Sequence, residues 1–356
     1  MQKIDRFLRL MNDRGASDLH LTVGRPPMLR VSGAMEPVRF RVISEADFTE
    51  MMQAVTPGRL WSDYTNTGDV DFSYEIPDTA RYRVNLFRQQ RGSGAVFRII
   101  PSKIMTVAQL GLPAAVRKIA AIESGLVLVT GPTGSGKSTT LAAIIDLINE
   151  TQALHIITIE DPIEFVHPNK KCLIHQREIG THATSFAEAL KAAGREDPDL
   201  ILVGEMRDVE TISMALSAAE KGTLVFGTLH TNNAAKTMER IISVFPAGEQ
   251  EGIRSVLGET VRAVVAQQLL PKVGGGRVAA LEILFASPAV GNMIREGKTG
   301  QITSTIQTGT KEGMVSMDMS IRKLFDEGKV TARAAYDKAI DKESFKTILG
   351  DEAAAR

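Results

Sequence analysis

The spacing of apolar residues changes near residue 114, so the chain carries two different patterns. Between Ile4 and Met11 apolar residues recur every three or four positions, which predicts an amphipathic helix at the start. The stretches "DLHLTV" and "ARYRVNLFRQ" alternate apolar and polar residues, which predicts strands with one buried face, and "MLRVSG" and "GAVFRII" are read as two further strands. Residues 1–100 are therefore predicted to form a small α+β domain with a largely antiparallel sheet.

After residue 114 short apolar runs alternate with segments of helical spacing. The runs are "LVLVTG", "LHIITIE", "DLILVGE", "TLVFGTLH" and "VAALEIL". Runs that are apolar on both faces are typical of a parallel sheet covered by helices. Past about residue 285 the spacing is helical to the end. The predicted organisation is an N-terminal domain at 1–100, a linker at 101–112, an α/β domain at 113–285 and a helical region at 286–356.

Composition excludes several classes of protein. Lys+Arg and Asp+Glu both number 42 in the 356 residues, so an overall basic surface is not indicated, although a local patch remains possible, and no nucleic-acid partner is predicted. Cys172 is the only cysteine, which excludes a disulfide framework and a multi-cysteine zinc site within one chain. No apolar run approaches the ~18 residues of a membrane span, so we expect a cytoplasmic protein without membrane insertion.

The stretch "GPTGSGKS" fits the phosphate-binding pattern G-x-x-x-x-G-K-[ST], and it lies between an apolar run and a segment of helical spacing. Its glycines let successive backbone N–H groups turn towards phosphate oxygens at a helix N-terminus. Lys137 is predicted to reach the β- and γ-phosphates, and the Ser138 hydroxyl to bind Mg²⁺. The residues predicted to hold the nucleotide are Gly131, Pro132, Thr133, Gly134, Ser135, Gly136, Lys137, Ser138 and Thr139.

Acidic residues and one histidine follow three other predicted strands. Glu205 ends "DLILVGE", where a carboxylate can hold Mg²⁺ or its waters. "IITIEDPIEF" brings Glu160, Asp161 and Glu164 close together; we choose Glu164, beyond the proline, as the group that polarises the attacking water. His230 ends "LVFGTLH" and is a candidate γ-phosphate sensor, although a single histidine is often structural.

The base of the nucleotide is predicted from the absence of a guanine-reading motif. "NKKC" at residues 169–172 lacks the aspartate of the guanine-reading N-K-x-D pattern, and no other segment of the sequence supplies it. Adenine is therefore favoured, and the predicted cofactors are ATP and Mg²⁺.

These motifs together resemble those of the secretion ATPase superfamily. "GPTGSGKS", "TIEDPIEF", "REDPDLILVGEMRD" and "FGTLHTNNAAKT" occur in the order and at the spacing typical of that superfamily, and "GASDLHL" and "RYRVNLF" match as well. Within it, the chain is most similar to the type IV pilus retraction ATPases of twitching motility. The resemblance implies a RecA-like ATPase domain, a PAS-like N-terminal domain and a ring hexamer that disassembles pili at the cytoplasmic side of the inner membrane. The implied partners are an inner-membrane pilus platform protein and an accessory retraction ATPase.

The resemblance also implies roles for individual residues. It gives Glu164 as the catalytic glutamate, Glu205 as the Walker B acid and His230 as part of the histidine box. Arg81 and Arg83 match the arginines that reach the nucleotide from the N-terminal domain. They lie two apart on a predicted strand and therefore share a face. As fingers acting on a neighbouring subunit they would neutralise charge on the leaving phosphate, although a pair of arginines on one exposed face is often only solvated.

Two departures from the family pattern keep alternatives open. Thr223 replaces the first histidine of the histidine box, and Gly291 replaces an arginine in "AVGNMIRE", where the family has "AIRNLIRE". Glycine inside a helix is expected to cost about 1 kcal/mol relative to alanine. An accessory retraction paralogue therefore remains an alternative, as does an assembly or secretion ATPase, although those usually carry a tetracysteine zinc element. A regulatory module that binds nucleotide without hydrolysing it is disfavoured by Lys137, Glu164 and Glu205 together.

Overall fold

The computed structural model describes residues 2–77, 79–100 and 103–354, which form two compact units. Unit 1 contains the chain up to Lys103 together with two later segments, Asp161–Val166 and Glu178–Thr184; unit 2 contains the rest. Residues 101 and 102, where the predicted linker starts, lie outside the described residues. None of the helices described is both long and apolar enough to cross a bilayer.

Unit 1 is built on a six-stranded sheet with the order β3-β2-β1-β6-β5-β4. All neighbouring strands are antiparallel, which confirms the prediction for this part of the chain. The alternation read from "ARYRVNLFRQ" is also confirmed, because Tyr82, Val84 and Leu86 are buried. The strands are β1 (Asp18–Thr22), β2 (Met28–Val31), β3 (Ala34–Pro37), β4 (Asp69–Ile76), β5 (Ala80–Gln89) and β6 (Gly92–Ile100).

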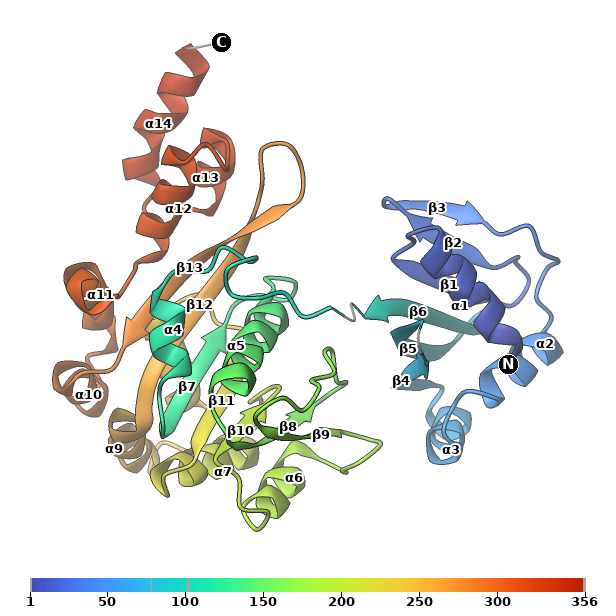
Figure 1. Ribbon diagram of the computed structural model, residues 1–356, viewed down its shortest axis with the longest axis horizontal. Helices are drawn as coiled ribbons and strands as arrows, with labels where there is room; N and C mark the ends of the chain where they lie inside the picture. The colour runs from blue at the N-terminus through green and yellow to red at the C-terminus, as the bar shows by residue number, and fades with distance from the viewer. Residues whose placement is uncertain (1, 78, 101–102, 355–356) are drawn as a thin grey trace. The chain divides into compact units, whose positions relative to one another are not determined.

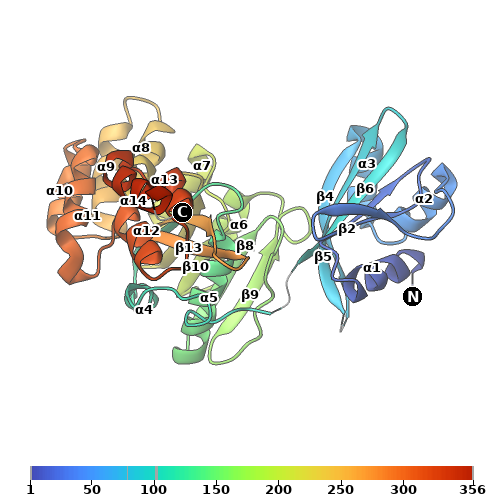
Figure 2. The same ribbon diagram turned by 90° about the horizontal axis from the view of Figure 1, so that it is seen from above.

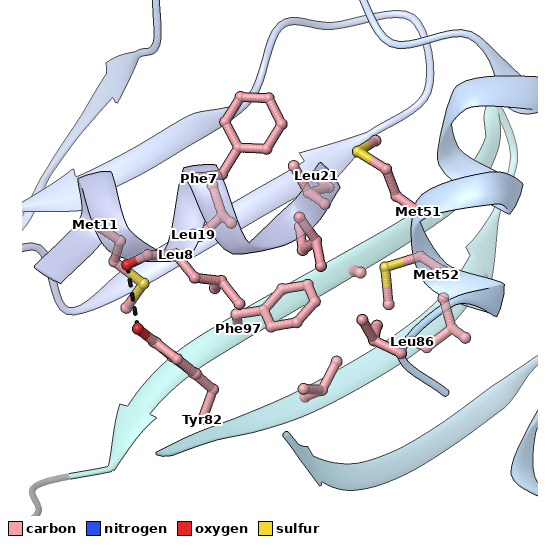
Figure 3. Packing of buried hydrophobic residues seen from close by; sticks show 14 of the residues in the cluster. Phe7, Leu8, Met11, Leu19, Leu21, Met51, Met52, Tyr82, Leu86 and Phe97 are labelled. Carbon is pink, nitrogen blue, oxygen red and sulfur yellow. Dashed lines mark hydrogen bonds between the residues drawn. The ribbon is translucent and has the colours of Figure 1, made fainter. Parts of the chain in front are cut away.

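Helices bury one face of this sheet. The helices are α1 (Lys3–Asp13), α2 (Glu45–Gln53) and α3 (Gly58–Thr67). Figure 3 shows apolar side chains of α1 and α2 meeting those of β1, β5 and β6, among them Phe7, Met52 and Phe97. The Tyr82 hydroxyl donates to the Leu8 carbonyl at 3.1 Å, so α1 is also tied to β5 by a polar contact. The predicted amphipathic helix is confirmed.

Unit 2 contains a seven-stranded sheet with the order β13-β12-β7-β11-β10-β8-β9. The pairs among β12, β7, β11, β10 and β8 are parallel, as predicted. β13, which holds "VAALEIL", runs antiparallel to β12, so its predicted place in a parallel sheet is wrong. β12 and β13 form a hairpin, and a hairpin forces its two strands to be antiparallel. The strands are β7 (Gly125–Thr130), β8 (His155–Glu160), β9 (Leu173–Glu178), β10 (Leu200–Val203), β11 (Leu224–Leu229), β12 (Val261–Pro271) and β13 (Arg277–Phe285).

Helices alternate with these strands and then continue alone to the end of the described chain (Figure 1). Buried residues of the last helices, such as Met317 and Ile321, share a core with Leu270 of β12 and Ala280 of β13. The fold is thus an α/β domain with a mostly parallel sheet, a smaller N-terminal α+β domain and a helical C-terminal region. The helices are α4 (Ala115–Ala120), α5 (Lys137–Thr151), α6 (Phe186–Ala193), α7 (Val209–Glu220), α8 (Ala234–Ser243), α9 (Gln250–Thr260), α10 (Pro288–Arg295), α11 (Ile302–Thr308), α12 (Met317–Asp326), α13 (Ala332–Lys338) and α14 (Lys342–Ala354), with 3₁₀ turns η1 (Thr299–Gln301) and η2 (Gly309–Glu312).

Gly291 has a packing role that the sequence did not reveal. Figures 1 and 2 both place α10 beside α9, and Gly291 of α10 meets Gly258 of α9 at this crossing. A Cβ on Gly291 would lie 2.7 Å from the Gly258 carbonyl oxygen, and a Cβ on Gly258 would lie 2.8 Å from the Gly291 carbonyl oxygen. Gly291 is expected to lower the stability of its own helix, but its missing side chain allows the backbones of α9 and α10 to approach closely.

We predict that Gly258→Ala lowers the midpoint of urea unfolding. Overpacking of this kind typically costs about 1–3 kcal/mol, because the two helices must separate to admit the methyl group. The matched control is Gly252→Ala in the same helix, where nothing lies within 4 Å of the added Cβ. That variant should raise the midpoint, since alanine favours the helix by about 0.5–1 kcal/mol. Equal shifts of the two variants would show that α9 and α10 do not pack tightly.

Candidate nucleotide-binding site

The predicted phosphate loop connects β7 to α5, between a fully buried strand and a helix of 15 residues. Gly131, Gly134 and Gly136 have positive φ angles of 147°, 77° and 85°. A Cβ on Gly131 would lie 2.3 Å from the Gln267 carbonyl oxygen, so a larger residue does not fit there. Pro132, Thr133 and Gly134 are exposed, whereas Ser135 is buried. The loop thus has the strand–turn–helix setting that a phosphate cradle needs.

Lys137, Ser138 and Thr139 occupy the first turn of α5. The Lys137 ammonium donates to the carbonyl oxygens of Gly131 at 2.7 Å and Pro132 at 3.3 Å. Its charge is therefore held over the loop that it follows. Ser138 and Thr139 are half-buried, and their backbone N–H groups are among those that a helix N-terminus leaves without intrahelical partners. This arrangement suits an anion at the mouth of the loop.

Gln267 fixes the loop from the neighbouring strand β12 and was missed by sequence reasoning. Its amide nitrogen donates to the Ser135 carbonyl at 2.6 Å, and its amide oxygen accepts from the Thr140 hydroxyl at 2.7 Å. The residue is 2% exposed. One buried amide therefore joins the loop to the first turns of α5. The available signal was the polar pair "QQ" inside an otherwise apolar strand.

Glu205 and His230 follow the adjacent parallel strands β10 and β11, and the structure brings them together. The Glu205 carboxylate contacts His230 Nε2 at 2.9 Å and Arg207 Nε at 2.5 Å. Burial alone would raise the pKa of Glu205, but the hydrogen bond and charge of Arg207, with those of His230, outweigh it and lower that pKa. Glu205 is thus held as a carboxylate. Arg207 was not singled out from the sequence.

The donor set fits a magnesium ion. A serine hydroxyl at Ser138 and the Glu205 carboxylate are hard oxygen donors of the kind that Mg²⁺ prefers. Within the described residues no cluster of three or more His, Cys, Asp or Glu side chains could hold a metal unaided.

The three acidic residues after β8 have different surroundings. Glu160 accepts hydrogen bonds from the Thr158 hydroxyl at 2.6 Å and the Gln176 amide at 3.2 Å, so its carboxylate is partly engaged. Asp161 and Glu164 are exposed. Asp161 and Glu164 belong to unit 1, whereas the phosphate loop belongs to unit 2. The choice of Glu164 as the base stays a prediction.

Arg81 and Arg83 lie on β5 of unit 1, and their side chains differ in exposure and in hydrogen-bond partners. Arg83 is about half exposed, and its Nε lies 3.6 Å from an Asp71 carboxylate oxygen. Arg81 is 17% exposed, and its guanidinium donates to the buried Glu178 carboxylate at 2.8 Å. Glu178 was not predicted as a site residue. The role of either arginine at a nucleotide stays a prediction.

Comparison with known proteins identifies the family. The family model described as Type II/IV secretion system protein matches residues 2–280. The chain is 50% identical over 342 residues to the type IV pilus retractation ATPase PilT of Pseudomonas aeruginosa, covering 96% of this chain and 99% of that protein. It is 36% identical over 356 residues to the type IV pilus ATPase PilU of the same organism, covering 99% and 93%.

A solved structure agrees with this result over nearly the whole chain. The crystal structure of the pilus retraction motor PilT with bound ADP has 43% identity and a TM-score of 0.89, covering 97% of this chain and 98% of that one. The predicted resemblance to the secretion ATPases is confirmed. The chain belongs to the Type II/IV secretion system protein family and is one of its ATPases.

Proposed function

We propose that the protein is a hexameric ATP-driven motor that retracts type IV pilus fibres. The observation that carries the proposal is the 50% identity to PilT across almost the full length of both chains, joined to a complete phosphate loop. Identity to PilU is lower, at 36%, which favours a principal motor over an accessory paralogue. As a retraction motor it would act from the cytoplasm on an inner-membrane platform protein, with an accessory retraction ATPase as a further partner.

The phosphate loop binds the triphosphate of ATP in the proposed mechanism. Backbone N–H groups from Gly134 to Ser138 surround the phosphate oxygens, and Lys137 exchanges its contacts with loop carbonyls for phosphate oxygens. Ser138 and Glu205 would hold Mg²⁺, which when bound neutralises charge that develops on the β- and γ-phosphates. Glu205 stays ionised for this task because Arg207 and His230 lower its pKa.

In the proposed mechanism, hydrolysis uses groups from both units. Glu164 polarises the attacking water, and His230 senses the γ-phosphate beside Glu205. Arg81 and Arg83 would add positive charge from the N-terminal domain of a neighbouring subunit in the ring. Since these arginines and Glu164 belong to unit 1 and the loop to unit 2, ATP turnover would be coupled to rotation of one unit against the other.

We predict that Lys137→Ala and Glu164→Gln separate binding from hydrolysis. Lys137→Ala removes the only side-chain charge of the loop and should abolish binding of a fluorescent nucleotide. Glu164→Gln should bind that nucleotide normally and hydrolyse ATP about 10²–10⁴ times more slowly, which is the usual contribution of a general base. Asp161→Asn, in the same segment, is the control and should keep most of the activity. Wild-type turnover by Glu164→Gln would assign the base to Glu160 or Asp161 instead.

The motor function is tested in a type IV piliated bacterium from which the retraction ATPase gene has been deleted. Expression of the chain should restore twitching zones and lower the number of surface pili, whereas the Lys137→Ala variant should restore neither. An assembly ATPase would instead restore pili to a strain that lacks its assembly ATPase. Failure to restore retraction, with the chain present at normal levels and active as an ATPase, would overturn the proposed function.

A further inference from the structure

Glu178 is a buried carboxylate that the sequence did not single out. It ends β9, belongs to unit 1, and its side chain is only 3% exposed. Burying a carboxylate costs folding free energy unless the group is paired and hydrogen-bonded. The hydrogen-bond partners of Glu178 therefore indicate its role.

One set of partners comes from the N-terminal sheet. The Arg81 guanidinium donates to Glu178 Oε2 at 2.8 Å and to the Ser73 hydroxyl at 2.7 Å. The Ser73 hydroxyl in turn donates to the Glu178 carboxylate at 2.8–2.9 Å. Ser73 on β4 and Arg81 on β5 therefore hold the carboxylate between them. The orientation of Arg81, the less exposed of the two candidate fingers, depends on this contact.

The other partner is the backbone beside the candidate base. The Ile163 N–H donates to Glu178 Oε2 at 3.1 Å, the oxygen that also accepts from Arg81. Ile163 and Phe165 are 4% and 8% exposed, while Glu164 between them is exposed. The segment is thus fixed by two buried side chains and one backbone hydrogen bond, and it presents Glu164 to solvent.

Glu178 itself is held by a compact turn. Its carbonyl oxygen accepts from the His182 N–H at 2.7 Å, and the Thr181 hydroxyl donates to its carboxylate at 3.3 Å. Its own N–H contacts His182 Nδ1 at 3.0 Å. A carboxylate fixed in this way can hold other groups in place, because it has little freedom of its own.

We propose that Glu178 is a positioning residue for ATP hydrolysis, which fixes Arg81 and the Glu164 segment relative to each other through one carboxylate oxygen. Arg81 and Glu164 of one chain then move together, although in the proposed function Arg81 serves the nucleotide of a neighbouring subunit. The inference deepens the proposed function, since it rests on the roles given there to Arg81 and Glu164. Ser73 supports the same contact.

The test is steady-state ATPase kinetics of the full-length Glu178→Gln variant. The variant keeps the side-chain shape but loses the charge and turns an amide NH₂ towards Arg81 or Ile163. We expect kcat to fall by at least about ten-fold, since small displacements of reacting groups have effects of this size. KM for ATP and the Kd of a fluorescent nucleotide should stay within two-fold, because the phosphate loop lies in unit 2. The kcat is expressed per nucleotide-binding site, titrated with the fluorescent nucleotide. A variant that only lost stability would have fewer sites but would keep the wild-type kcat per site.

The matched control is Glu75→Gln. Glu75 is the other carboxylate beside Arg81, at 3.4 Å, but it is 57% exposed, and no hydrogen bond or ion pair among the described residues joins it to the Glu164 segment. Its kcat should stay within two-fold of wild type. The double variant Glu178→Gln/Arg81→Gln should be no slower than the slower single variant, because residues that act as a unit are not additive.

Several outcomes would overturn the proposal. They are an unchanged or increased kcat in Glu178→Gln, an equal loss in Glu75→Gln, or single effects that multiply in the double variant. If Glu178→Gln does not fold, Ser73→Ala takes its place and should lower kcat with KM unchanged; an unchanged kcat then refutes the proposal. A wild-type chain that hydrolyses ATP without retracting pili would contradict the proposed function and leave this inference standing.

Discussion

The buried carboxylate of Glu178 accepts hydrogen bonds from a guanidinium, a hydroxyl and a backbone N–H, and the arrangement of unit 1 depends on it. These contacts explain why Asp161–Val166 and Glu178–Thr184 group with the N-terminal sheet although they lie far along the sequence. A buried charge must be satisfied, so the segments that satisfy it are drawn together. As a result, the candidate base Glu164 belongs to the unit that carries Arg81 and Arg83.

In unit 2 the glycine-rich phosphate loop has to be held in one conformation. The loop gains no rigidity from its own side chains, and glycine has the largest conformational freedom to lose. Gln267 of β12 restricts the conformation of the loop through two hydrogen bonds, one with the loop and one with α5. Glu205, Arg207 and His230 form a second fixed group beside strands β10 and β11. The phosphate loop is thus held by contacts within unit 2, while Arg81 and the Glu164 segment are joined by contacts within unit 1.

Local patterns in the sequence predicted the local parts of this structure. The helix at Lys3–Asp13, the alternation along β5, the phosphate loop and the C-terminal helices each depend on neighbours within a few residues. Glu205 and His230 could be placed together because parallel strands end at one edge of a sheet.

The features that were missed depend on contacts between residues far apart in the chain. Gln267 reaches a loop more than 130 residues earlier, and Glu178 reaches Arg81 across 97 residues. The close approach of Gly258 and Gly291 depends on how two helices pack, which neither helix shows alone. The antiparallel direction of β13 was missed because an apolar run has the same appearance in either direction. The predicted ends of the domains and the role of Glu164 stay predictions.

We expect the Glu164 segment to move with the N-terminal sheet when nucleotide binds. This movement is tested by distances between pairs of spin labels at exposed positions: Asn66 with Val166, both in unit 1, and Val166 with Lys191, which is in unit 2. Cys172 is buried and does not compete for the label. On addition of ADP the 66–166 distance should stay constant while the 166–191 distance shifts. A shifted 66–166 distance with a constant 166–191 distance would contradict the account.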